Sequence, residues 1–299
     1  MSEIAQPCTD TAPLNPVQLL LPSLSAMVQD LAHMLPPSSM VHALQAKQLL
    51  LQMGNAAQVV GLRSVQQLMH AMLAPLELYT QTGQAGVDKS GELLQLAARD
   101  LQDFLEATGR GEQPSPQSLF ASYRALSKLN GKDTAHPCDL WDHAWTLATL
   151  PAPEDVDPLS PCAELRTQLD QQVLGLLRTS DPALCSTLKK LCLGLAAHLP
   201  DTTTWQLAAA WLEGIEHLLL DVDLYAKRMA SRLLAHYASI VKSQDCAAPA
   251  NLQQELLYFC HQACSAAQSR EIALPQLLHK VHAVCHKAAA LEQDRASAT

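Results

Sequence analysis

Apolar residues recur at intervals of three and four along most of this chain, and short stretches rich in proline, glycine and serine interrupt them. This spacing places apolar side chains on one face of an α-helix. Aromatic residues make up only 4% of the chain, and β-branched runs bounded by turn residues, which are typical of strands, are hard to find. The sequence therefore predicts an all-α fold.

Four helices are predicted within residues 15–109, after a polar N-terminal tail over residues 1–14. Asn15-Pro16 opens the first helix, Gly61 ends the second and Gly109 ends the fourth. Four amphipathic helices joined by short loops favour an antiparallel bundle.

Single residues predict where these helices bend and how the second one begins. Pro22 is expected to kink the first helix or to reset its start, and Pro75 is expected to bend or divide the third helix. Either Ser38 or Ser39 is expected to cap the second helix, over residues 40–60, in which Leu44 and Leu50 are among the residues expected to face inward.

The rest of the chain is predicted as a connector and a second bundle. Residues 110–160 lose the helical periodicity and gain proline, so they are expected to be a connector with one short helix at about 118–129. The helical pattern then resumes as about six helices over residues 161–292, followed by a tail over 293–299. No repeat of fixed period is found, which favours a compact bundle over a solenoid.

Composition excludes several classes of function. Twenty basic and 29 acidic residues give a formal charge of −9, without a concentrated basic run, so no nucleic-acid partner is expected. No apolar run approaches the roughly 20 residues that span a bilayer, so no membrane insertion is expected. Nine scattered cysteines are an odd number and are typical of reduced thiols, which favours a cytoplasmic location.

Residues 40–62 have the hydrophobic rhythm of a histidine-phosphotransfer helix and end in its Gly-Leu turn, Gly61-Leu62. The phosphotransfer motif is His-x-x-Lys-Gly about six residues before that turn. Counting back from the turn places Leu51 at the histidine position, Gly54 at the basic position and Asn55 at the glycine position. We therefore predict a degenerate phosphotransfer bundle with no phosphorylation site and no catalytic residue, which can still bind partners.

Two other groups of residues compete with this interpretation. His42 is the alternative phosphate carrier, but it lies two and a half turns before Leu51, and Lys47 falls on a different helix face. Cys260/Cys264 and His282/His286 are i,i+4 pairs that a helical hairpin could bring to one zinc ion. Buried cysteine is common in alanine-rich helices, so ordinary packing is favoured, and no metal or cofactor is predicted.

Five segments, in this order along the chain, carry a family resemblance. They are AAQVVGLRSVQQLMHAM over residues 56–72, His136-Pro-Cys-Asp-Leu-Trp141, the leucine pattern over 165–178, Trp205-x-x-Ala208-x-x-x-Leu212-Glu213, and Glu255-Leu-Leu-Tyr258-Phe. In these segments the chain resembles the FimL-type regulatory proteins and the N-terminal region of ChpA/PilL-type kinases, which contain degenerate phosphotransfer modules of the chemosensory system that controls type IV pili.

The resemblance implies a cytoplasmic, non-enzymatic scaffold of a two-component pathway for twitching motility, with recruitment to the cell pole left open. Its implied protein partners are a chemosensory kinase, a response regulator or a pilus-pole organiser. Two alternatives stay open: an active phosphocarrier that uses His42 or a C-terminal histidine, and a metal-responsive helical protein that uses the Cys/His group.

Overall fold

The computed structural model describes residues 16–82, 89–131, 135–141, 148–179, 181–243 and 246–297. Within these ranges the regular elements are eleven α-helices and two short 3-10 helices, and no strand occurs among them. The predicted all-α class is therefore confirmed. The chain divides into two compact units, Met1–Asp142 and His143–Thr299, and each is described by itself.

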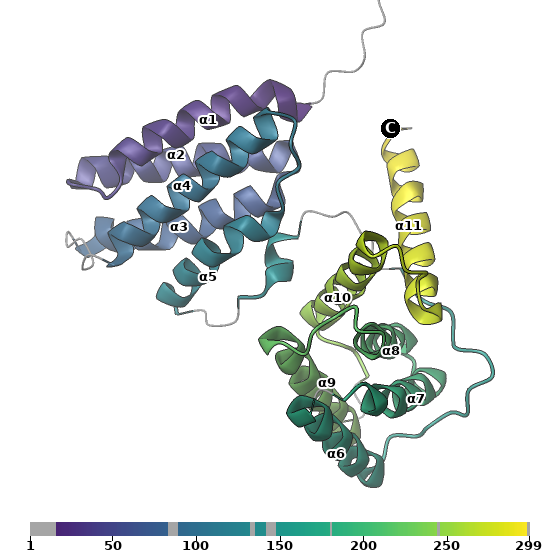
Figure 1. Cartoon of the computed structure of the whole chain (residues 1–299). Helices are drawn as coiled ribbons and strands as arrows, with labels where there is room; N and C mark the ends of the chain where they lie inside the picture. The colour runs from purple at the N-terminus through teal and green to yellow at the C-terminus, as the bar shows by residue number, and fades with distance from the viewer. Residues whose placement is uncertain are drawn as a thin grey trace, which may run out of the picture. The chain divides into compact units, whose positions relative to one another are not determined.

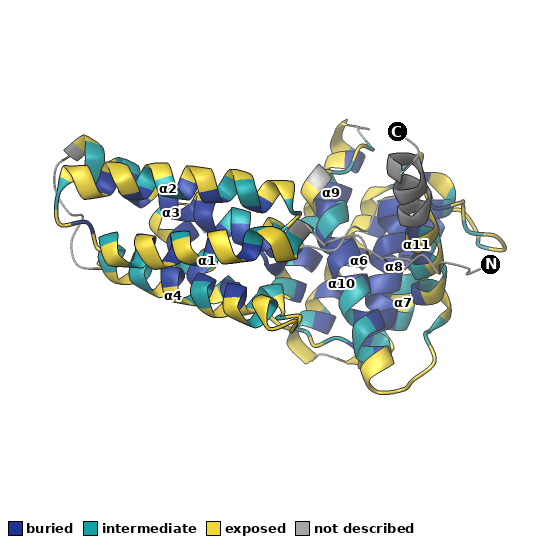
Figure 2. Cartoon of the chain, turned by 90° about the horizontal axis from the view of Figure 1, so that it is seen from above, coloured by how far each residue is buried: buried dark blue, intermediate teal, exposed yellow. Residues whose placement is uncertain are grey.

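Four long helices form the body of the first unit (Figure 1). They are α1 (Pro16–Met34), α2 (Met40–Val59), α3 (Arg63–Thr82) and α4 (Lys89–Gly109). α2 packs along α3, and α1 packs along α4 and α2. The buried residues of each helix lie on the side that faces the other helices, and its exposed residues lie on the outer side (Figure 2). The core side chains include Leu24, Val28, Leu31, Leu50, Met53, Leu68, Met72, Leu101 and Leu105.

The segment after α4 contributes to the same core. The 3-10 helix η1 (Pro116–Leu119) leads into α5 (Phe120–Leu129), and both pack against α3 and α4. Leu119 and Leu126 are seven residues apart, so they share a face, and both are fully buried. The short helix η2 (Pro137–Leu140) adds Leu140 to this core. Part of the segment expected to be a connector is thus packed structure.

Neither of the prolines inside α1 and α3 divides its helix. Pro22 lies within α1 and Pro75 within α3, and both helices are continuous. A proline inside a helix removes the N–H that would bond to the carbonyl four residues earlier. For Pro75 this is the carbonyl of Ala71, and the side-chain amide of Asn130 donates a hydrogen bond to it at 3.0 Å.

The ends of α2 follow the local signals of the sequence. Ser39 is the N-cap, and its hydroxyl accepts a hydrogen bond from the backbone N–H of His42 at 3.2 Å. Gly61 has a φ of 77°, which a residue without a Cβ adopts at little cost. The N–H of Leu62 then bonds back to the carbonyl of Ala57 at 2.9 Å, so the Gly-Leu turn is a helix C-cap.

In its described residues the second unit contains six helices, one of which is buried by its neighbours. They are α6 (Ala163–Thr179), α7 (Pro182–His198), α8 (Thr202–Glu216), α9 (Leu224–Ser243), α10 (Ala250–Ser269) and α11 (Gln276–Ser297). Residues 203–215 of α8 are all buried, because α7, α10 and α11 pack against it. None of the described helices of either unit is long and apolar enough to cross a membrane.

Candidate binding surface

Leu51, which the sequence predicts to stand at a degenerate phosphotransfer position, lies on the outer face of α2 with 47% of its surface exposed. Gly54 is half-buried and Asn55 is exposed. A side chain at position 51 is therefore accessible to a partner protein, but an aliphatic side chain has no nucleophile for a phosphoryl group.

The outer face of α2 is unusually apolar. Val41, Leu44, Leu51 and Val59 are exposed by 62, 52, 47 and 79% respectively. The expectation that Leu44 faces inward was wrong. The buried positions are Ala43, Ala46, Leu50, Met53 and Ala57. Their alternating spacing of three and four fixes the phase of the helix, and that phase turns Leu44 toward solvent.

This outer face also carries little charge. The only ionisable side chains between Met40 and Val59 are His42 and Lys47, and the amine of Lys47 pairs with the carboxylate of Glu77 on α3 at 2.8 Å. The remaining exposed side chains of the helix are mostly Gln and Asn. An uncharged stripe with several exposed aliphatic side chains is the kind of patch that marks a protein interaction site.

His42, the alternative carrier, lies in the first turn of α2. Its Nδ1 atom is hydrogen-bonded with the hydroxyl of Ser38 at 2.9 Å, and its backbone N–H is held by Ser39. Nine residues, about two and a half turns, separate it from Leu51. The structure therefore places His42 in the capping region of the helix.

A groove of about 880 Å³ lies at one end of the first unit. The connection between α1 and α2, the helices α3 and α4, and the end of α5 form its walls, with Pro36, Pro75, Tyr79, Leu94 and Leu129 among the lining residues. Gly91 permits this arrangement, because a Cβ there would lie 2.9 Å from the Cβ of Pro36. Sequence reasoning missed the groove, since its walls come from four separate segments.

The Cys/His group of the second unit is split between two environments. Cys260 and Cys264 are buried on α10, and the thiol of Cys260 donates to the carbonyl of Leu207 on α8 at 3.7 Å. His282 is half-buried and His286 is exposed on α11. Among the described residues, the ligand atoms of these four side chains are not gathered within 4.8 Å of one another.

Burial also makes these thiols poor ligands. Burial raises the pKa of Cys264 to about 11 and raises the pKa of Cys260 well above its usual value of 9.0, with the neighbouring Cys264 and Cys285 adding to the shift of Cys260. Metal ligation by cysteine requires the thiolate. The hypothesis of one zinc ion on these four residues therefore has no geometric support.

Glu213, in one of the segments that carry the resemblance, holds two helices together. Its Oε2 atom accepts hydrogen bonds from the backbone N–H groups of Leu277 and Leu278, at 2.8 and 3.0 Å. These groups belong to the first turn of α11, where backbone donors lack helical partners and a negative charge is favourable. The amine of Lys189 on α7 lies 3.8 Å from Oε1. Glu213 thus anchors α11 to α8.

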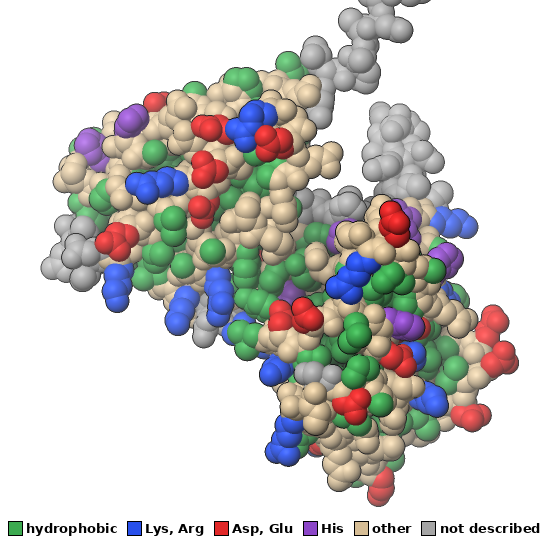
Figure 3. Space-filling model, in the orientation of Figure 1, with side chains coloured by type: hydrophobic (Ala, Val, Ile, Leu, Met, Phe, Trp, Pro, Cys, Tyr) green, Lys and Arg blue, Asp and Glu red, His purple; other side chains and the backbone are tan. Residues whose placement is uncertain are grey.

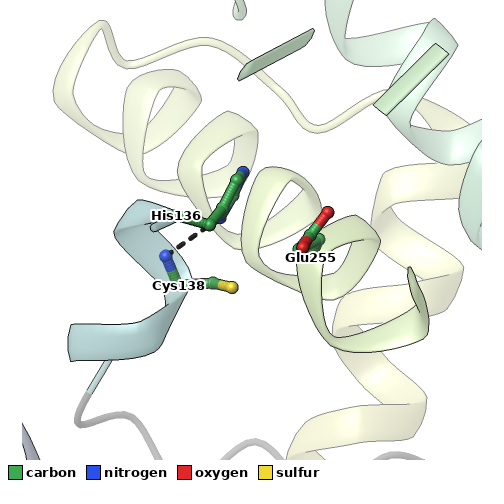
Figure 4. A group of neighbouring side chains, drawn as sticks. All are labelled: His136, Cys138 and Glu255. Atoms are coloured by element: carbon green, nitrogen blue, oxygen red, sulfur yellow. Dashed lines mark hydrogen bonds between the residues drawn. The ribbon is translucent and has the colours of Figure 1, made fainter. Parts of the chain in front are cut away.

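Two further segments that carry the resemblance, residues 136–141 and 255–259, also make structural contacts. In η2, His136 and Asp139 form a capping box, and the N–H of Cys138 donates to Nδ1 of His136 at 3.1 Å, the dashed line of Figure 4. Glu255, labelled in the same figure, lies on α10 and pairs with Arg232 of α9. The ring of Phe259 contacts that of Trp211, with centroids 6.2 Å apart.

Comparison with known protein families finds a match, which covers the helices that contain Glu213 and Glu255. Residues 154–298 match the family model described as the FimL scaffold protein second domain. No curated protein and no solved structure matches the chain. The matched residues span all six helices of the second unit and include Glu213 and Glu255. The resemblance to FimL-type scaffolds is therefore confirmed over residues 154–298, which are similar to the second domain of FimL scaffold proteins.

Proposed function

We propose that this chain is a non-catalytic scaffold of the chemosensory two-component pathway that controls type IV pili and twitching motility. Its partners are protein components of that pathway: the kinase, a response regulator or a pilus-pole organiser. The match of residues 154–298 to a scaffold family supports the class. The proposal places the protein in the cytoplasm, with recruitment to the pole through these partners.

The observation that carries the proposal is the exposed Leu51 on the apolar face of α2. A phosphocarrier needs a nucleophilic imidazole at the docking surface, and this surface has an aliphatic side chain there instead. Exposed apolar area that is buried on association drives binding, and a few central residues usually supply most of the affinity. We therefore assign partner binding to α2 and no phosphoryl transfer to the chain.

The test is affinity capture of the full-length chain from the native cell, followed by mass spectrometry. Leu51→Glu puts a charge in the centre of the proposed interface and should reduce recovery of pathway proteins by about tenfold or more. Leu174→Glu is the matched control, because Leu174 on α6 is also 47% exposed. Equal recovery by both variants, or recovery of unrelated metabolic enzymes only, would refute the proposal.

A second experiment addresses the phosphocarrier alternative. The chain is incubated with the cognate kinase and radiolabelled ATP, and acid-labile phosphate on histidine is measured. We expect none. Labelling that disappears in His42→Ala would establish the alternative and exclude a scaffold without phosphate chemistry.

A further inference from the structure

Three histidines lie along one side of α11. His282 and His286 are one turn apart, and their ring centroids are 4.2 Å apart with an interplanar angle of 50°. His279 precedes His282 by three residues, so it shares the same helix face. His279 and His286 are exposed, and His282 is half-buried. Figure 3 shows histidine side chains at several separate places on the surface of the second unit.

We propose that His282 and His286, joined by His279, bind a divalent transition-metal ion such as Zn²⁺ on the outer side of α11. Imidazole nitrogen is a preferred ligand of zinc, with bonds of about 2.0–2.1 Å, and i,i+4 histidines on a helix are a recurring ligand pair. The three ligand nitrogens are not all within 4.8 Å of one another, so closing the site requires side-chain rotation. The exposed side chains of His279 and His286 can rotate within nanoseconds, whereas His282 is half-buried.

The ligand type sets the selectivity of the site. Mg²⁺ and Ca²⁺ require oxygen ligands, so neither should bind to imidazole nitrogens here.

This site differs from the zinc hypothesis drawn from the sequence. The earlier set joined the histidines to Cys260 and Cys264, which are buried with raised pKa values. The new set uses histidines alone and leaves the remaining coordination positions to water. A shallow site of this kind suits reversible metal sensing or a ligand contributed by a partner.

The test is calorimetric titration of the untagged full-length chain with Zn²⁺, and with Mg²⁺ as the negative control. We expect one Zn²⁺ per chain, binding weakened at least about tenfold in His282→Ala/His286→Ala, and a smaller loss in His279→Ala. His217→Ala, at an exposed histidine of the same unit, should bind as the unmodified chain does. Circular dichroism confirms that the variants remain folded.

Two results would overturn the proposal. One is the absence of zinc binding by the unmodified chain, and the other is unchanged binding by the double variant. A Co²⁺ titration adds a spectroscopic criterion, because a thiolate-to-cobalt charge-transfer band would show that cysteines and not histidines bind the metal.

Discussion

The side-chain amide of Asn130 donates a hydrogen bond to the backbone carbonyl of Ala71 at 3.0 Å, across 59 residues of sequence. Pro75 has no N–H to offer that carbonyl, so Asn130 takes the place of the missing helical donor. One residue after α5 thereby satisfies the backbone of α3 at its proline. This is how α3 continues through Pro75 without division, and how the end of α5 is fixed beside the groove.

We expect Asn130→Ala to lower the free energy of unfolding by about 1–3 kcal/mol, because it leaves the Ala71 carbonyl without a partner. Urea denaturation followed by circular dichroism measures this loss. Asn55→Ala, at an exposed asparagine on α2, should change stability by less than about 0.5 kcal/mol. Pro75→Ala restores the N–H, so the cost of Asn130→Ala should shrink in that background. An equal cost in both backgrounds would contradict this explanation.

Glu213 gives a second prediction, for the attachment of α11. Glu213→Ala removes the acceptor of two backbone N–H groups and should destabilise the chain by about 3 kcal/mol or more. Glu213→Gln keeps an acceptor oxygen of the same reach and should cost less. Hydrogen exchange at Leu277 and Leu278 should accelerate in the alanine variant, and unchanged protection there would exclude the anchoring role.

The cysteines should separate into two reactivity classes. Among the described cysteines, Cys162 is exposed and Cys246 is half-buried, whereas Cys138, Cys185, Cys192, Cys260, Cys264 and Cys285 are buried. Burial raises the pKa of Cys185 to about 11 and that of Cys192 to about 12. We expect iodoacetamide at pH 8 to label Cys162 and Cys246 in the folded chain, and to label the buried group only in denaturant. Peptide mass spectrometry reads out the sites.

Stability should fall at alkaline pH. Burial, and then the charge of Asp139, raise the pKa of Tyr123 to about 12 from its usual 10.0, and burial raises that of Cys192 to about 12 from 9.0. The folded state therefore keeps these protons when the unfolded state has lost them. The stabilisation is complete below pH 9 and is lost progressively as the pH rises toward 12.

Urea midpoints between pH 8 and 11 measure this loss, and Tyr123→Phe should flatten part of the dependence above pH 10. A midpoint that stays constant over this range would show that these groups do not titrate differently in the two states.

The sequence alone determined the class of the fold and many of its helix ends. The helix ends at Ser39 and Gly61, and the helical spacing of the leucines, depend on contacts within four or five residues. Such contacts can be predicted from the local sequence. The same short-range reasoning predicts that Leu51 stands where a phosphotransfer helix would carry its histidine, and this stays a prediction. It also placed His282 and His286 on one face, because helical spacing is a local property.

Only the tertiary structure decided the features that join distant segments. The bond from Asn130 to Ala71 spans 59 residues, and the cap from Glu213 to Leu277 spans 64. The groove lined by Pro36, Pro75 and Leu94 likewise needs several packed helices. Leu44 shows that sequence periodicity does not decide which face of a helix is buried. The sequence of α2 has apolar residues on two faces, and the face that contains the alanines packs against α3. Helix formation is governed by neighbours in sequence, whereas burial is governed by neighbours in space.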